Sequence, residues 1–147
     1  MSLIGAMQGA VGLESLSRGC EEAHFVEYSP WVTKNCLSPN VASIGFKRES
    51  VVHTEKVEAF LKRAEGAPAF AGGAFDFVSV TPPYLDVSYP ELYDLLDRSP
   101  LLHEGSIVMV EYSKQNRADI RESIGGLQQV KNRQYGRTFL AIYAADA

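Results

Sequence analysis

Short apolar stretches with the composition of β-strands alternate with stretches of helical spacing along almost the whole chain. Strands are predicted at residues 23–28, 50–54, 75–80 and 106–112. Helices are predicted at residues 13–17, from the Ser29-Pro30 pair to about Pro39, at 56–64, and after the Ser88-x-x-Glu91 capping box. This alternation predicts an α/β fold in which helices cover both faces of a mostly parallel sheet. Residues 127–133 and 138–143, on either side of Tyr135-Gly136-Arg137, predict a final antiparallel hairpin.

Length and composition fit a single domain that covers residues 1–147. With 46% hydrophobic and 22% charged residues, the chain can bury a core without metals or disulfides. No stretch approaches the ~18 apolar residues of a membrane span, and the first residues lack the basic start of a targeting peptide. Cys20 and Cys36 lack zinc-ligand spacing. We therefore expect an intracellular protein without a metal site, with reduced thiols. The net charge of −4 argues against gripping nucleic acid by bulk charge alone, although a local basic face is compatible with it.

Ligands of parallel α/β sheets bind beyond the carboxyl ends of the strands, so the residues there are the candidates for a site. Glu27 follows the first predicted strand, and a carboxylate at this place accepts two hydrogen bonds from a ribose diol. An exposed carboxylate without a ligand is an equal alternative. Gly5, Gly9 and Gly12 suit a loop whose backbone N–H groups close around a ligand, or else a frayed terminus.

The sharpest local signal is Thr81-Pro82-Pro83-Tyr84, directly after the most strand-like segment. The two prolines cannot continue a central strand, so they fix the backbone at its end. Tyr84 then offers a flat face on which a planar base can stack. The alternative is a tight turn with a packing tyrosine.

The remaining candidates are ambiguous. His53, between a strand and a helix, is more often a structural than a catalytic residue, and His24 and His103 have no partner that the sequence identifies. Lys131, Arg133 and Arg137 make the final hairpin basic around Tyr135. They fit either a nucleic-acid contact or an edge strand that charge protects from further pairing.

Together these motifs resemble the RsmD-type ribosomal RNA methyltransferases. GAVGLESLSRG at residues 9–19 and HFVEYSPWV at 24–32 are similar to the family's glycine loop and ribose acid. FDFVSVTPPY at 75–84 resembles its strand-four signature, usually DPPY or DPPF, and YGRTFLAIY at 135–143 its final hairpin. The similarity spans nearly the whole chain and is greatest to the plant and algal branch, which adds a chloroplast or other organelle to the expected locations.

The resemblance implies a Rossmann-like class I fold that binds S-adenosylmethionine. Its members transfer the methyl group to the exocyclic amino group of a guanine in small-subunit ribosomal RNA. Carried over, Gly9 and Gly12 belong to the cofactor loop, and Glu27 holds the cofactor ribose. Thr81, Pro82, Pro83 and Tyr84 form the pocket for the target base. The expected partner is ribosomal RNA or a pre-ribosomal particle.

Several departures from the family pattern leave a second hypothesis open. Counting back from Gly12, the motif's Asp falls on Leu3 and its first Gly on Met7, and Thr81 replaces the usual Asp. The family's first strand and N-terminal extension have no counterpart, so the chain is expected to be N-terminally truncated. We expect weak cofactor binding, and low stability or association with a copy or partner that donates a strand. The alternative function is a catalytically inactive methyltransferase-fold subunit with a structural or RNA-associated role in a larger assembly.

Overall fold

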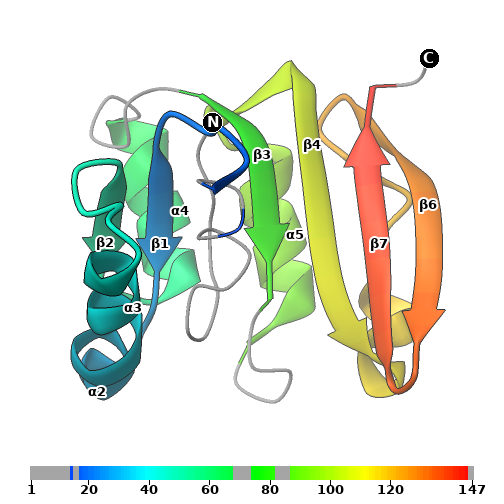
Figure 1. Ribbon diagram of the computed structural model, residues 1–147. Helices are drawn as coiled ribbons and strands as arrows, with labels where there is room; N and C mark the ends of the chain where they lie inside the picture. Colours follow the sequence, from blue (N-terminus) through cyan, green and yellow to red (C-terminus); the bar gives the residue numbers. More distant parts are fainter. Residues whose placement is uncertain (1–13, 15–16, 68–73, 82–86, 146–147) are drawn as a thin grey trace.

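The computed structural model describes residue 14 and residues 17–67, 74–81 and 87–145 (Figure 1). In chain order its elements are β1 (Ala23–Val26), α2 (Pro30–Val32), the π-helical turn η2 (Thr33–Leu37), α3 (Ser38–Ser43), β2 (Ser50–His53), α4 (Val57–Gly66), β3 (Phe75–Val80), α5 (Tyr89–Asp97), β4 (Leu102–Ser113), the 3₁₀ helix η4 (Lys114–Asp119), β5 (Ser123–Ile124), β6 (Leu127–Tyr135) and β7 (Thr138–Ala144). The predicted helix at 13–17 lies mostly outside the described residues.

The strands form two hydrogen-bonded groups. β1 and β2 make a parallel pair, and the other five strands are ordered β3-β4-β7-β6-β5. β3 and β4 are parallel, whereas β7 runs antiparallel to both β4 and β6. Figure 1 shows β1, β2, β3, β4 and β6 pointing toward the same edge and β7 the opposite way. The predicted mostly parallel α/β sheet that ends in an antiparallel hairpin is therefore confirmed.

Both predicted helix starts have the expected caps. The Ser29 side chain accepts a hydrogen bond from the N–H of Val32 at 3.3 Å, and that of Ser88 accepts one from the N–H of Glu91 at 3.4 Å. Proline follows each cap within the first turn, where its missing N–H is not needed. The first helical stretch continues through η2 and α3 to Ser43, further than predicted.

β4 is longer than its apolar pattern predicted. It begins four residues before the predicted start, at Leu102, which pairs with Phe75 of β3, and it ends one residue later than predicted, at Ser113, which pairs with Thr138 of β7. Glu111 lies within the strand, in agreement with the predicted range, and pairs with Leu140. The segment between β4 and β6 contains η4 and β5.

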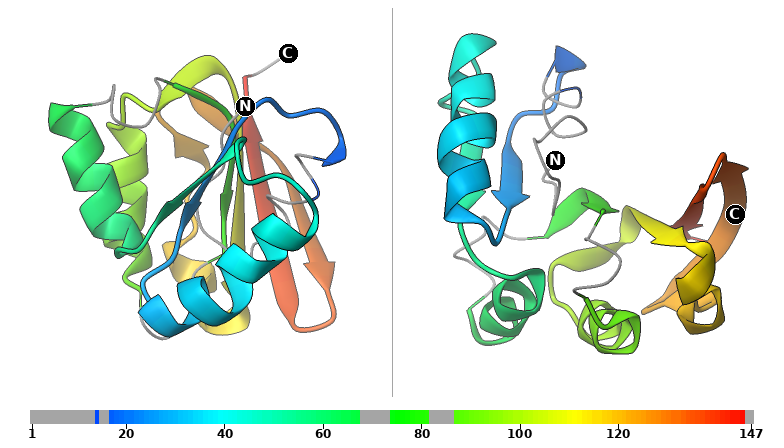
Figure 2. Two further views of the ribbon diagram at one scale, coloured as in Figure 1. Left: turned by 60° about the vertical axis from the view of Figure 1, so that its left-hand side comes forward. Right: turned by 90° about the horizontal axis from the view of Figure 1, so that it is seen from below.

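Helices cover the sheet from both sides. Figure 2 shows α4 and α5 along one face and α2 with α3 on the other, next to β1. The large core contains 21 buried residues from β3, β4, β7 and the two helices that cover them, joined by Val26 of β1. A separate cluster of Ala23, Phe25, Leu37 and Val41 lies between β1 and the α2–α3 side. The predicted layers are thus present, with unequal cores.

Two tyrosines show how polar groups are accommodated in the large core. The hydroxyls of Tyr93 and Tyr143 are 2.6 Å apart, and Tyr143 donates to the carbonyl of Arg121 at 2.6 Å. Burial raises the pKa of both phenols. Each hydroxyl therefore stays protonated and hydrogen-bonded in the folded protein.

No backbone pairing joins β1 to β3 among the described residues. The two sheets meet instead through side chains, such as the rings of His24 and Phe75, whose centroids are 5.6 Å apart. The strands β1 and β3 therefore leave a gap in backbone pairing within the described part of the chain. Strand donation by a partner stays a prediction. Cys20 and Cys36 are free thiols, both half-buried.

Candidate functional site

The carboxyl ends of the parallel strands define the candidate site. β1, β2 and β3 end at Val26, His53 and Val80, and their arrowheads in Figure 1 point to one edge. The N–H of Glu27 donates to the carbonyl of His53 at 2.9 Å, which extends the β1–β2 pairing by one residue. The structure therefore brings Glu27 beside the end of β2, where ligands of such sheets bind.

The Glu27 side chain is half-buried and oriented by its own loop. Its Oε1 accepts a hydrogen bond from the N–H of Ser29 at 3.3 Å. Ser29 is in turn the cap of α2, so the helix start fixes the loop that carries the carboxylate. A carboxylate held at this position fits the hydroxyl groups of a ribose, which are hydrogen-bond donors.

Two exposed aromatic residues flank this loop. The exposed fractions of Tyr28 and Trp31 are 64% and 66%, large for apolar rings. The ammonium group of Lys56, which precedes α4, lies 5.1 Å from the centroid of the Tyr28 ring. Sequence reasoning did not identify either ring as part of the site, although both belong to the quoted motif HFVEYSPWV.

Thr81 is half-buried and follows the last paired residue of β3, Val80, which lies opposite Val110 of β4. The structure thus places Thr81 and Glu27 at the carboxyl ends of the two strands that border the gap. Of the other predicted site residues, Gly9, Gly12, Pro82, Pro83 and Tyr84 lie outside the described residues, as do Leu3, Gly5 and Met7.

His53 belongs to a hydrogen-bonded chain that sequence reasoning missed. Its Nε2 is 2.9 Å from Nδ1 of the buried His24, whose Nε2 is 2.5 Å from Oε1 of Glu22. On the other side, Nη2 of Arg63 is 3.4 Å from Nδ1 of His53. One assignment satisfies every contact: Arg63 donates to His53, His53 to His24, and His24 to Glu22. His53 is then neutral, with its proton on Nε2.

Burial is the main cause that lowers the pKa of His53 to about 4, followed by the charges of His24 and Arg63. His53 is therefore neutral near pH 7 and has no proton to give as a general acid. Its ring also packs against Phe60, with centroids 4.9 Å apart. These contacts support the structural interpretation of His53 over the catalytic one.

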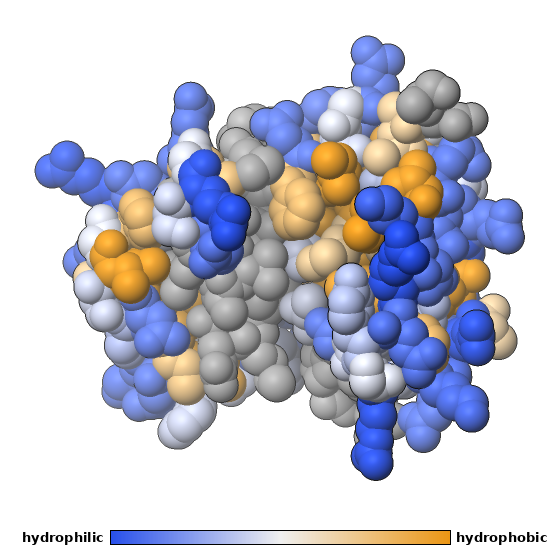
Figure 3. Space-filling model, turned by 45° about the vertical axis from the view of Figure 1, so that its right-hand side comes forward, coloured by the Kyte–Doolittle hydropathy of each residue, from blue (hydrophilic) through white to orange (hydrophobic). Residues whose placement is uncertain are grey.

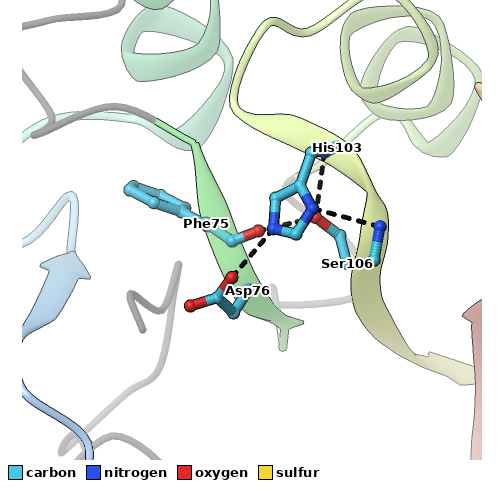
Figure 4. Close-up of polar contacts among 5 residues, drawn as sticks. Phe75, Asp76, His103 and Ser106 are labelled. Carbon is cyan, nitrogen blue, oxygen red and sulfur yellow. Dashed lines mark hydrogen bonds and ion pairs between the residues drawn. The ribbon is translucent and has the colours of Figure 1, made fainter.

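A second polar cluster lies at the opposite, amino end of β3 and has the residue types of a hydrolase triad (Figure 4). Nε2 of His103 lies 2.8 Å from Oδ1 of Asp76, and this hydrogen bond lowers the pKa of the carboxyl. Nδ1 of His103 accepts from the N–H of Gly105 at 3.0 Å. The buried Ser106 hydroxyl donates to the carbonyl of Phe75 at 2.6 Å. Because both ring nitrogens and the hydroxyl are committed to other groups, the cluster joins β3 to β4 and offers no nucleophile.

The described residues contain no group of three or more His, Cys, Asp or Glu placed to hold a metal ion. No helix among them has the length and apolar character needed to cross a bilayer.

Known proteins share both the sequence pattern and the fold. The family described as Conserved hypothetical protein 95 matches residues 5–144. "Putative rRNA methyltransferase YlbH" of Bacillus subtilis is 27% identical over 138 residues, which are 94% of this chain and 71% of that protein. A conserved hypothetical protein of Streptococcus pyogenes superposes with a TM-score of 0.82, 22% identity, and coverage of 99% and 86% of the two chains. For "Putative methyltransferase yhhF" of Escherichia coli the corresponding values are 0.78, 21%, 99% and 76%.

The strand order, the antiparallel final hairpin and these structural neighbours define the class I fold of S-adenosylmethionine-dependent methyltransferases. Within that class, the chain belongs to the Conserved hypothetical protein 95 family, since the match covers nearly its whole length. The resemblance to the RsmD type is confirmed. The plant and algal branch stays a prediction.

Proposed function

We propose that this protein is an S-adenosylmethionine-dependent ribosomal RNA methyltransferase that acts on the exocyclic amino group of a guanine in small-subunit RNA. The family match over residues 5–144 is the observation that carries the proposal. The curated relative named as an rRNA methyltransferase supports RNA as the substrate. The position of Glu27 at the end of β1 supports the cofactor, because it is where a ribose acid is needed.

Glu27 would hold the ribose of the cofactor through hydrogen bonds that both ribose hydroxyls donate. The contact with the N–H of Ser29 orients the carboxylate before the ligand arrives, which lowers the ordering cost of binding. Gly9 and Gly12 would complete the cofactor loop with their backbone N–H groups. When bound, S-adenosylmethionine supplies an electrophilic methyl group.

Thr81, Pro82, Pro83 and Tyr84 would form the target-base pocket at the end of β3. Carbonyl oxygens near Thr81 and Pro82 would accept hydrogen bonds from the amino group and so orient its nitrogen toward the methyl donor. Tyr84 would stack on a base taken out of the RNA helix. Positioning of the amino group against the methyl donor then supplies most of the acceleration, because no side chain of the pocket has to form a covalent bond.

One observation favours a second candidate function. Leu3 and Met7 stand where the family's cofactor motif has Asp and its first Gly, and Thr81 replaces the usual Asp of the signature. A charged hydrogen bond of about 1.5–3 kcal/mol is thereby missing from the cofactor loop. The alternative is therefore a catalytically inactive subunit of the same fold, with a structural or RNA-associated role in a larger assembly.

Calorimetric titration with S-adenosylmethionine, combined with tritium transfer to small-subunit RNA, tests the proposal. We expect the wild-type chain to bind the cofactor weakly and to transfer methyl groups slowly, and Glu27→Gln should weaken cofactor binding further, by roughly 10- to 150-fold, without changing RNA binding. Glu21→Gln, which removes an exposed carboxylate before β1, is the matched control and should have no effect.

The target end is tested separately in the same transfer assay. Tyr84→Ala should lower the rate by roughly 5- to 150-fold through loss of stacking, whereas Tyr84→Phe keeps the ring and should be mild. Thr81→Asp restores the family carboxylate and should preserve or raise activity. RNA binding without any cofactor binding or transfer would instead establish the inactive subunit.

A further inference from the structure

The basic residues of this acidic protein are concentrated in one segment. Residues 114–137 contain six Lys or Arg residues and two acidic ones, a net charge of +4 in a chain whose total is −4. Lys131 and Arg133 lie on β6, and Arg137 on the turn that joins β6 to β7. Tyr135 lies between them and is 62% exposed.

Most arginines outside the β6–β7 hairpin form ion pairs, including Arg121 of the same segment. On the helical side Arg63, Arg98 and Arg121 contact carboxylates of Glu55, Glu65 and Asp94 at 2.6, 2.7 and 2.8 Å. By contrast, Lys131, Arg133 and Arg137 are all exposed, and none of the ion pairs within the described residues includes them. These three positive charges of the hairpin are therefore available to bind an external anion.

The register places these side chains on one face of the sheet. Lys131, Arg133 and Tyr135 alternate along β6 and pair with Ile142, Leu140 and Thr138. Asn132 between them points the other way, since its Oδ1 accepts a hydrogen bond from the buried Tyr112 at 2.7 Å. The three side chains thus project from the face opposite α5, beside the half-buried apolar residues of β7. Figure 3 brings this side forward and shows strongly hydrophilic side chains next to an apolar patch.

The same register brings the hairpin to the level of the candidate site. Arg133 pairs with Leu140, and Leu140 pairs with Glu111 of β4, the residue after the Val110 that pairs with Val80 of β3. Thr81 follows Val80 at the end of β3. From β6, which carries Arg133, to β3 there are three strand spacings of about 4.8 Å each, across β7 and β4. A nucleic-acid strand that enters the site at the end of β3 can therefore reach the hairpin within a few nucleotides.

We propose that Lys131, Arg133, Tyr135 and Arg137, here called the hairpin surface, bind single-stranded RNA adjacent to the base that enters the site. This inference rests on the proposed methyltransferase function and adds a binding surface to it. The three cations contact phosphates, and the Tyr135 ring stacks on a base. Glu111, the acid of this face nearest in register, lies one strand further from Arg133, opposite Leu140.

RNA explains the combination of residues better than two alternatives. Protection of an edge strand requires charge but not an exposed aromatic ring beside it. An acidic protein partner would also complement the positive charges of the hairpin surface. The labelled RNA used in the experiment tests RNA binding directly and so distinguishes the two. Stacking plus unpaired cations is the arrangement that binds single strands with little sequence preference.

The test measures anisotropy of a fluorescein-labelled single-stranded RNA with a small-subunit sequence, at several salt concentrations. The triple variant Lys131→Gln/Arg133→Gln/Arg137→Gln removes three charges, and Lys34→Gln/Lys47→Gln/Arg48→Gln removes three exposed ones from the β1–β2 side as the matched control. We expect the hairpin variant to reduce the slope of log K against log salt by roughly 2, since each phosphate contact contributes about 0.7. Tyr135→Ala should weaken binding by roughly 5- to 150-fold.

Circular dichroism and calorimetry with S-adenosylmethionine accompany the hairpin variants, and both should match the wild type because the changed residues are exposed and lie on β6 and its turn, across the sheet from β1 (Figure 1). An unchanged salt slope in the hairpin variant overturns the inference, even if the wild type methylates RNA and the proposed function stands. Equal losses in both triple variants overturn it as well. Failure of the wild type to bind the RNA, with transfer to a ribosomal protein instead, would overturn both proposals.

Discussion

The β1–β2 pair and the five-stranded sheet are built from the same strand and helix types but are held together differently. The five-stranded sheet shares its core of 21 buried residues with α4 and α5. The β1–β2 pair shares a cluster of four buried residues with η2 and α3 and has a chain of hydrogen bonds through His24 and His53. Because β1 and β3 have no backbone pairing in the described part, side chains couple the two regions. Apolar burial thus dominates in the five-stranded sheet, and polar contacts contribute more to the β1–β2 pair.

Matched leucine truncations give the largest expected effect on this comparison. Leu92 of α5 and Leu37 of η2 are both fully buried, one in each cluster. Leu92→Ala should lower the free energy of unfolding by about 2–5 kcal/mol, measured by urea denaturation. Leu37→Ala should cost less globally and instead increase amide exchange in β1 and β2. Equal exchange increases in both sheets after Leu37→Ala would show that the regions unfold as one unit.

Ser106→Ala probes the five-stranded sheet at its amino end. The buried hydroxyl both accepts from the N–H of His103 at 3.0 Å and donates to the carbonyl of Phe75 at 2.6 Å. Its loss should cost about 1–3 kcal/mol, because two buried backbone groups lose their partner. Thermal unfolding measures the change, and cofactor binding at the opposite edge should stay the same. A change in cofactor affinity would contradict the separation of the two edges.

Acidification should weaken the β1–β2 region selectively. Because the folded pKa of His53 is about 4 and the ordinary value is 6.5, the unfolded chain binds the proton more readily. This stabilisation is complete above pH 6.5 and is lost as the pH falls toward 4, by an amount on the order of 1–2 kcal/mol. Exchange of the β2 amides against pH measures it. His53→Gln keeps the Nε2 donor and should flatten the profile, whereas an unchanged profile would assign the effect to another group.

Gly105→Ala should have the smallest effect. A Cβ there would lie 3.1 Å from Cε1 and 3.3 Å from Nδ1 of His103, so the ring must move by a few tenths of an ångström. We expect a loss of under about 1 kcal/mol, and a weaker contact with Asp76 seen as a rise in the carboxyl pKa by NMR titration. An unshifted Asp76 would show that the ring does not control this carboxylate.

Local sequence signals were sufficient for most of the fold. Phe75–Val80 was bounded correctly because its apolar run meets two prolines, and the caps at Ser29 and Ser88 combine a hydroxyl with a proline in the first turn. The full length of β4 was not predictable, because its ends are set by strands distant in the sequence: Leu102 pairs with Phe75 of β3, and Ser113 pairs with Thr138 of β7.

The site was predictable to the same degree. Glu27 and Thr81 were identified from their position after a strand, which depends only on neighbouring residues. The contacts of His24 with His53 and of His103 with Asp76 join strands 29 and 27 positions apart, and no local pattern specifies such contacts. The exposure of Tyr28 and Trp31 likewise depends on tertiary packing, which leaves their strand-end loop uncovered.

The exposed Trp31 also has a spectroscopic consequence. It is the chain's sole tryptophan, and folding leaves two thirds of its surface in water. Its emission should therefore be red-shifted already in the native state and should change little when the cores unfold. A ligand that settles near the Glu27 loop would instead shield the indole and shift its emission to the blue. The protein thus carries an intrinsic fluorophore whose emission reports ligand binding at the carboxyl ends of the strands and changes little on global unfolding.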